Sequence, residues 1–271
     1  MTESAKKAAQ IISQKALGFT PKLAITLGSG LGDIAELLEN PVKIAYSTLP
    51  DFPPCTVAGH AGNLYLGKLN GLPVACLQGR AHFYEGISPV VAKTYVRTMK
   101  LIGCESILLT NACGSMRENI VPGDLMLIRD HINFQFTNVL MGHNDSEFGE
   151  RFVGMEDAYD MSLREKMLAI ANQISVPLHQ GVYFGVLGPS FETPAEIQCF
   201  KNMGGDVVAM SLINEVITAR HCGLRVAAIS AVSNMAAGMS REKISHELTL
   251  SGVKLATDKL KKLVLAFVER Y

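Results

Sequence analysis

Residues 22–32 have the sequence KLAITLGSGLG, and this stretch decides the fold. Its first six residues are mostly apolar, which predicts a buried strand over 22–27. A glycine-rich turn follows at 28–32, and residues 33–39 have a helical pattern. A strand, a turn and a helix in this order form the unit from which α/β proteins are built.

The rest of the chain alternates between short apolar stretches and helical patterns. Further strands are expected at 64–69, 73–77, 106–110, 125–132, 181–187, 207–210 and 225–232, and helices at 1–20, 90–102, 163–174, 194–203 (with Thr193 as N-cap), 215–222 and 240–271. Asn70 and Gly71 predict a two-residue hairpin turn and hence an antiparallel pair, because both positions need a positive φ. The sequence therefore predicts an α/β fold with a mixed central β-sheet flanked by helices.

Nothing in the composition divides the chain, since it has no Pro-rich linker, charge run or internal repeat. A single domain over residues 1–271 is therefore expected. The segment 131–152 is irregular and long for a connection. Loops of this length are usually functional, disordered or turned toward a partner.

The charge balance limits the kinds of partner. The chain carries 25 basic and 25 acidic side chains, so its net charge is zero, and only 18% of its residues are charged. Such a chain has no long-range field for nucleic acid or a membrane surface, and any anion must be held by a local site. The low charge content also favours an oligomer that buries surface against further copies of the chain.

Other classes are disfavoured by missing patterns. The six cysteines include no Cys-x-x-Cys pair and are expected to be the reduced thiols of a cytoplasmic protein. Residues 1–20 lack the apolar core of a signal peptide, and the longest uncharged stretch, 172–191, is interrupted by proline and glycine, so no membrane span is expected. Neither Gly-x-Ser-x-Gly nor His-Glu-x-x-His occurs, which argues against a serine hydrolase and a metal site.

Three short segments have groups that suit an anion. The turn at 28–32 opens a helical stretch, where backbone N–H groups can hold phosphate, but its spacing is equally compatible with a tight turn alone. Residues 59–62, GHAG, place His60 between small residues, and residues 110–115 follow a strand and offer further amide donors. Each of these patterns also occurs in proteins that bind no ligand there.

The segment GRAHFYEG, residues 79–86, follows the second strand of the hairpin. If it is extended, Arg80, His82 and Tyr84 share one side. An arginine beside an imidazole suits phosphate, and a tyrosine ring suits a sugar. The alternative is a solvated loop in which Arg80 pairs with Glu85.

Two segments suit a flat heterocycle. Residues 188–194, GPSFETP, form a rigid turn in which Phe191 can stack on a ring while Glu192 accepts an N–H. The alternative places Phe191 in the core and Glu192 at a helix start, where the dipole favours it. Residues 232–238, VSNMAAG, end an apolar strand with Asn234, whose amide both donates and accepts.

Taken together, these segments resemble the trimeric purine nucleoside phosphorylases, the branch that cleaves 6-oxopurine nucleosides. The likeness runs from about residue 20 to the C-terminus, and the matching segments occur in the family's order: 27–32, 59–62, 78–86, 110–115, 188–196, 207–211, 215–222 and 233–238.

The resemblance implies reversible phosphorolysis. A purine ribonucleoside or 2′-deoxyribonucleoside such as inosine or guanosine would react with inorganic phosphate to give the free base and the pentose 1-phosphate, with no organic cofactor and no metal. A cytoplasmic homotrimer in purine salvage is expected. A nucleoside hydrolase on a related scaffold and a non-catalytic nucleoside-binding protein remain the alternatives.

The resemblance also implies a role for each site residue. Phosphate would be held by Ser29, His60, Arg80, His82, the backbone of Ala112, and Ser211. The nucleoside would contact Tyr84, Phe148, Phe191, Glu192, Val208, Met210, Ser233, Asn234 and His246. The catalytic set would be Asn234, Glu192, His82 and His246, with Asn234 donating to the purine as negative charge develops there. Phe148 resembles the aromatic residue that reaches into the adjacent subunit's sugar site.

Two departures from the family pattern bear on the site. Residues 212–214 are Leu-Ile-Asn where the family usually has Thr or Val, then Val and Pro, which leaves the phosphate affinity open. Residues 204–208 and 240–246 look most like the bacterial subgroup that accepts xanthosine. Val186 and Leu187 lack the tyrosine associated with that breadth, so activity on xanthosine is open as well.

Overall fold

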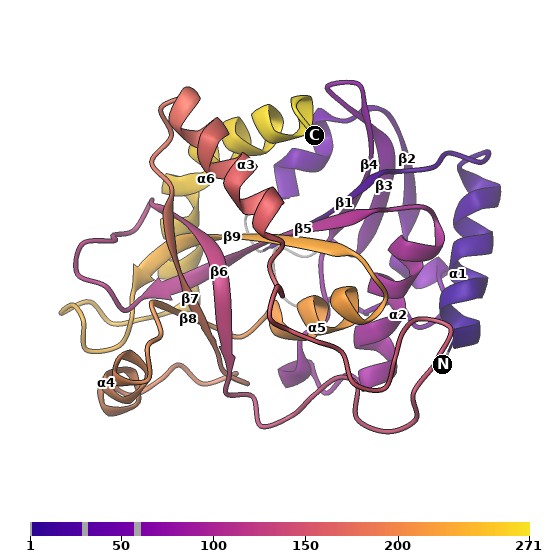
Figure 1. Cartoon of the computed structure of the whole chain (residues 1–271). Helices are drawn as coiled ribbons and strands as arrows, with labels where there is room; N and C mark the ends of the chain where they lie inside the picture. The colour runs from indigo at the N-terminus through magenta and orange to yellow at the C-terminus, as the bar shows by residue number, and fades with distance from the viewer. Residues whose placement is uncertain (1, 29–31, 57–60) are drawn as a thin grey trace.

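The computed structural model describes residues 2–28, 32–56 and 61–271. Its centre is a nine-stranded sheet with the order β2-β3-β4-β1-β5-β8-β7-β6-β9 (Figure 1). The strands are β1 Leu23–Leu27, β2 Glu39–Ala45, β3 Asn63–Leu69, β4 Leu72–Gln78, β5 Ser106–Ser115, β6 Leu125–Asn133, β7 His179–Gly185, β8 Val207–Ala209 and β9 Arg225–Met235. Parallel and antiparallel pairs both occur, which confirms the mixed sheet.

Helices cover both faces of this sheet. They are α1 Thr2–Lys15, α2 Pro89–Leu101, α3 Met161–Gln173, α4 Pro194–Asn202, α5 Ile213–His221 and α6 His246–Glu269. Figure 1 shows α3 and α6 on one side of the central strands and α5 on the other. Successive residues of β1 point to opposite faces, so Leu23 and Ile25 belong to the core under α3 and α6, while Ala24 belongs to the core under α1, α2 and α5. The predicted α/β fold class is confirmed.

The hairpin between β3 and β4 is also confirmed. Leu69 pairs with Leu72 in an antiparallel register, and Asn70 and Gly71 have φ values of 47° and 79°. Both turn residues are therefore left-handed, as a two-residue turn of this kind requires.

Several local predictions differ from the structure. The helix expected at 33–39 is a short 3₁₀ helix, Gly32–Leu37, and the chain then enters β2, which was not predicted. β2 lies at the edge of the sheet, and among its residues only Ile44 is buried. Edge strands tolerate proline and polar residues and therefore lack the apolar alternation that identifies a strand. The first helix ends at Lys15 rather than at residue 20, and the mostly helical closing segment is helical only from His246.

One gap in the pairing positions the site. β1 pairs with β5 only as far as Leu109, and β8 pairs with β5 from Gly114, whereas β9 follows β5 along its whole length. β9, β6, β7 and β8 are paired in turn, so with β5 these strands close into a ring. Among the described strands, none pairs with residues 110–113 of β5 on the side where β1 ends and β8 begins. That edge of β5 faces the cavity described next.

Candidate active site

A cavity of about 450 Å³ opens at the gap beside β5. Most of the residues expected from the sequence line it, namely Arg80, His82, Tyr84, Ala112, Phe191, Glu192, Val208, Met210, Ser211, Ser233, Asn234 and His246. They come from segments that are far apart in the chain, and the closed strands bring them together. The structure therefore gathers the proposed phosphate residues and the proposed nucleoside residues around one space.

Three expected residues are not part of this gathering. Ser29 and His60 lie outside the described residues. Phe148 does not line the cavity of its own chain. Phe148 lies on the loop between β6 and α3, and its ring centroid is 4.4 Å from the guanidinium carbon of Arg97 on α2.

Sequence reasoning missed several lining residues: Asn111, Cys113, Gly114, Pro189, Ala209, Ala236 and Thr249. Most of them lie inside segments that had already been singled out. Thr249 does not, but it follows His246 by three positions on α6, and residues at that spacing share a helix face.

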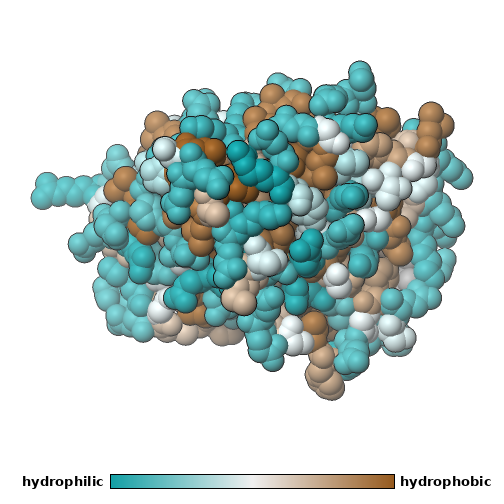
Figure 2. All heavy atoms as spheres, turned by 45° about the horizontal axis from the view of Figure 1, so that its top comes forward, coloured by the Kyte–Doolittle hydropathy of each residue, from teal (hydrophilic) through white to brown (hydrophobic). Residues whose placement is uncertain are grey.

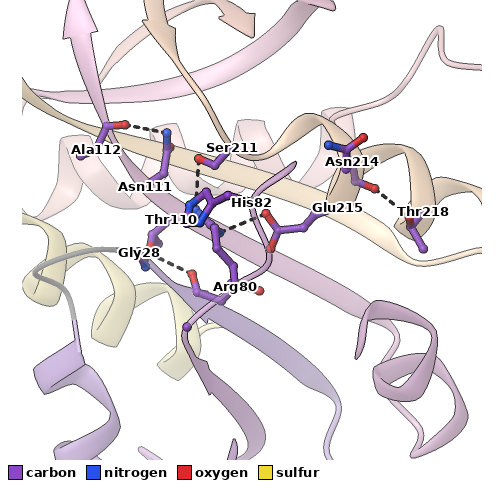
Figure 3. Close-up of polar contacts among 12 residues, drawn as sticks. Gly28, Arg80, His82, Thr110, Asn111, Ala112, Ser211, Asn214, Glu215 and Thr218 are labelled. Atoms are coloured by element: carbon purple, nitrogen blue, oxygen red, sulfur yellow. Dashed lines mark hydrogen bonds and ion pairs between the residues drawn. The ribbon is translucent and has the colours of Figure 1, made fainter. Parts of the chain in front are cut away.

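Arg80 lies at the buried end of the cavity, with only 1% of its surface exposed. Its Nε lies 3.1 Å from Glu215 Oε2, and its Nη1 donates to Ser211 Oγ at 3.4 Å. Figure 3 shows Arg80 between these two residues. Its Nη2 is buried and has no hydrogen-bond partner among the described residues, so it can donate to an anion. The alternative pairing of Arg80 with Glu85 is wrong.

Glu85 instead holds His82. Its Oε1 lies 2.8 Å from His82 Nδ1, and its Oε2 accepts from the Thr56 hydroxyl at 2.5 Å. Burial by itself would raise the pKa of Glu85, but the hydrogen bonds from His82 and Thr56 outweigh it and lower the pKa to about 2. Because Glu85 is ionised, its carboxylate accepts the N–H at His82 Nδ1. This fixes the tautomer of the neutral His82 ring, in which Nε2 is the acceptor nitrogen.

The segment that carries His82 is not extended. Residues Phe83–Glu85 form a 3₁₀ helix, so alternation along a strand does not apply. His82 and Tyr84 nevertheless lie together, since their rings stack at 4.7 Å, and both line the cavity with Arg80. The prediction of a shared side is correct, although the backbone that produces it is different.

Two glycines allow close packing at the gap. A Cβ on Gly28 would lie 2.8 Å from the backbone of Asn111, so only glycine lets the end of β1 approach β5. Gly28 N–H donates to Thr110 Oγ1 at 3.2 Å. A Cβ on Gly114 would lie 3.3 Å from Asn234 Nδ2, so Gly114 leaves room for that amide.

A β-bulge aims Asn234. Cys113 pairs with Val232 and Gly114 pairs with Asn234, so Ser233 has no partner residue in the ladder. The Ser233 hydroxyl lies 2.7 Å from Asn234 Oδ1 and can donate to it. Asn234 Nδ2 donates to the carbonyl of Met235 at 3.0 Å. The amide orientation is therefore fixed, and the second N–H of Nδ2 is left to donate elsewhere.

The other end of the cavity is more open. Phe191 and Glu192 lie on the connection between β7 and α4, and Phe191 is 44% exposed, so the alternative of a core phenylalanine is wrong. Thr193 is the N-cap of α4 as predicted, and Glu192 precedes the helix. Burial raises the pKa of Glu192 above its ordinary value, with a smaller contribution from Glu196.

The described residues form neither a metal-binding cluster nor a membrane-spanning helix. Within residues 2–28, 32–56 and 61–271, no three His, Cys, Asp or Glu side chains are grouped so as to hold a metal ion. In the same part of the chain, no helix is both long and apolar enough to cross a bilayer.

Comparison with known proteins identifies the superfamily to which the chain belongs. Residues 22–269 match the model of the phosphorylase superfamily. Purine nucleoside phosphorylase 1 of Bacillus subtilis is 45% identical over 271 residues, which is all of both chains. Among solved structures, isoform 2 of the Schistosoma mansoni purine nucleoside phosphorylase with cytosine and ribose-1-phosphate has a TM-score of 0.94 at 38% identity, covering 99% of this chain and 96% of that one.

A Schistosoma mansoni purine nucleoside phosphorylase in complex with inosine has a TM-score of 0.93 at 36% identity, with coverage of 99% and 96%. The chain belongs to the purine nucleoside phosphorylases of this superfamily. The family and the enzyme class expected from the sequence are thus confirmed.

Proposed function

We propose that the cavity binds a 6-oxopurine nucleoside beside inorganic phosphate and exchanges the base for phosphate at C1′ of the sugar. One observation carries this proposal: the buried Arg80 guanidinium, with Nη2 unpaired among the described residues, shares a cavity with Asn234 and Glu192. The Schistosoma proteins bind inosine in one structure and ribose-1-phosphate in another, which supports the same chemistry here.

Phosphate lies at the buried end in this proposal. Arg80, His82, Ser211 and the Ala112 backbone hold it, with Ser29 and His60 assigned by resemblance alone. A guanidinium and hydroxyl donors suit the oxygens of a phosphate dianion, and Nε2 of His82 accepts from its remaining P–OH. Glu215 balances the Arg80 charge before phosphate arrives, because an unpaired buried cation would be costly.

The nucleoside lies at the more open end. Tyr84, Met210 and His246 contact the sugar, while Phe191 and Val208 contact the base. Glu192 accepts the purine N1–H, and the remaining Asn234 N–H donates to N7 or O6. As the glycosidic bond lengthens, negative charge develops on the purine and the Asn234 bond strengthens, which is catalysis by differential binding. Phosphate stabilises the developing sugar cation and then attacks C1′.

A homotrimer is part of this proposal, with Phe148 completing the sugar site of the adjacent subunit. The loop that carries Phe148 also exposes Phe136 and Phe152, at 84% and 88%. Large exposed aromatics concentrated in one loop favour an interface. On the side to which α3 and α6 belong, Figure 2 shows mostly hydrophilic side chains.

We place the enzyme in cytoplasmic purine salvage, with phosphate as co-substrate and no metal or organic cofactor.

The test is an activity panel over inosine, guanosine, xanthosine and adenosine, each with and without phosphate. Cleavage of inosine and guanosine that requires phosphate and yields the pentose 1-phosphate is expected, with adenosine the poorest substrate because Glu192 then meets no N1–H. Cleavage without phosphate would establish a hydrolase, and binding without turnover a nucleoside-binding protein. Either result overturns the proposal, and sizing in solution tests the trimer.

A further inference from the structure

The chain makes an unusual turn immediately after β8, at the phosphate end of the cavity. Leu212 has φ 66° and ψ −55°, and Ile213 N–H donates to the Ser211 carbonyl at 2.8 Å. These values define a γ-turn of the rarer, positive-φ form, which strains a residue with a side chain. Leu212 begins the departure from the family pattern at 212–214, so the structure shows which backbone this departure adopts.

Tyr183, on the neighbouring strand, forms hydrogen bonds to this turn. Tyr183 lies on β7, paired with Val207 of β8, and its ring is fully buried. Its hydroxyl accepts from Ser211 N–H at 3.0 Å and donates to the Ser211 carbonyl at 2.9 Å. One hydroxyl therefore satisfies both backbone groups of a single residue, which fixes the peptide planes on either side of Ser211.

These two hydrogen bonds hold the Ser211 backbone and thereby position its side chain. Ser211 Oγ accepts from Arg80 Nη1 at 3.4 Å. An oxygen that accepts from a guanidinium must direct its own proton elsewhere, and the cavity lies on the open side of Ser211. With the backbone held, Ser211 Oγ lies beside the cavity before any anion enters, and its hydroxyl can donate there.

We propose that Tyr183 is a positioning residue of the phosphate site, which holds Ser211 and its γ-turn so that the Ser211 hydroxyl donates to phosphate. This inference rests on the proposed function, in which Ser211 binds phosphate. Tyr183 is not among the residues that line the cavity. Burial raises its pKa well above the ordinary tyrosine value, so the hydroxyl keeps the proton that it donates.

The test is Tyr183→Phe, which keeps the buried ring and removes both bonds to Ser211. The KM for phosphate is expected to rise about tenfold, since two hydrogen bonds hold the turn, while the KM for inosine and kcat at saturating phosphate change little. Tyr159→Phe is the matched control, because Tyr159 is equally buried and its hydroxyl bonds His131 rather than the turn. An unchanged phosphate KM in Tyr183→Phe, or equal rises in both KM values, would overturn the inference.

A double-mutant cycle with Ser211→Ala separates positioning from general loosening. If Tyr183 acts through the Ser211 hydroxyl, Tyr183→Phe adds little to the rise in phosphate KM that Ser211→Ala already causes. Additive effects contradict the inference. Phosphate-independent cleavage by the unaltered enzyme would instead contradict the proposed function, so the two failures are distinguishable.

A readout without mutation covers the case in which Tyr183→Phe fails to fold. Hydrogen exchange of the Ser211 amide in the unaltered protein is expected to be slow before phosphate is added, because Tyr183 already occupies that N–H. Fast exchange that slows only with phosphate would show that the turn is not held in advance, and would overturn the inference.

Discussion

The two ends of the cavity are built in opposite ways. At the buried end, where we propose that phosphate binds, Arg80, Ser211 and Glu215 belong to a polar network, and the exposed fractions of the Arg80 and Glu215 side chains are only 1% and 3%. At the more open end, where we propose that the base binds, Phe191 and Glu192 lie on a connecting loop. Buried hydrogen bonds and ion pairs therefore hold Arg80 and Ser211, whereas Phe191 and Glu192 depend on the conformation of a more exposed loop.

The two ends therefore differ in how a substitution affects stability and substrate specificity. A buried network couples phosphate binding to folding, because removal of one member leaves the others desolvated and unpaired. A loop can change its side chains with little effect on the core. Phosphate is common to all substrates of such an enzyme while the base varies, so substitutions at the base end are expected to change substrate preference more than stability.

Arg80→Ala should give the largest effect, because it removes a phosphate donor and leaves Glu215 buried without a counter-charge. Phosphate binding is expected to weaken by about 2–5 kcal/mol, or roughly 30- to 5,000-fold in kcat/KM for phosphate. The free energy of unfolding should fall by about 3–5 kcal/mol. Steady-state kinetics and denaturant titration measure the two losses.

Two controls sharpen this prediction. The double variant Arg80→Met with Glu215→Leu should recover much of the stability and none of the phosphate binding, since both buried charges are then absent. Lys6→Ala removes one partner of an exposed pair with Glu147 and should leave the free energy of unfolding almost unchanged. Equal losses of stability in Arg80→Ala and Lys6→Ala would break the contrast between buried and open polar groups.

Asn234→Ala comes next, because Asn234 is the proposed donor to the leaving purine. Loss of a donor to the leaving purine typically costs about 10²–10³-fold in rate. The loss should fall on kcat at saturating inosine and phosphate, with the phosphate KM almost unchanged. Single-turnover kinetics isolates the chemical step, and a near-normal rate there would remove Asn234 from the mechanism.

Glu192 tests the base end through pH. Because burial raises its pKa above the ordinary value, the carboxylate that must accept N1–H is lost at a higher pH than for an exposed glutamate. On acidification, kcat/KM for inosine should fall as Glu192 becomes protonated. Glu85, with a pKa of about 2, stays ionised throughout that range.

Glu192→Gln supplies the comparison for this profile. It should lower kcat/KM for inosine by about 10- to 100-fold at neutral pH, as expected for loss of a charged hydrogen bond, and remove the acidic limb assigned to Glu192. Unfolding should change little, because the loop is outside the core. An acidic limb that persists unchanged in Glu192→Gln would assign it to another group.

The sequence predicted the parts of the molecule whose signal is local. β1 and the β3–β4 hairpin carry an apolar run and a turn pair that need no tertiary context. The edge strand β2 was missed because its residues face water on most sides. Among site residues, those inside glycine-rich or strand-end motifs were found.

The positioning residues could not be found in this way. Glu215 and Tyr183 act on residues that lie 135 and 28 positions away in the sequence, and only the closed sheet brings them together. The sequence could have flagged Glu215 as an acid in a helix, but its partner Arg80 follows β4, in a distant part of the chain. Long-range pairing of buried polar groups has no periodicity that a sequence pattern can reveal.

Leu212 offers the smallest and most local test of the phosphate end. Replacement by alanine removes a buried side chain and should cost about 2–5 kcal/mol. In ordinary positions glycine is about 0.5–1 kcal/mol worse than alanine, because it has more freedom to lose on folding. At φ 66° the order should reverse, with Leu212→Gly more stable than Leu212→Ala by about 1 kcal/mol, since a Cβ is penalised there. Denaturant titration of both variants shows which of them is more stable. A more stable alanine variant would mean that the turn stores no strain. The buried end would then differ from the open end only in its charges.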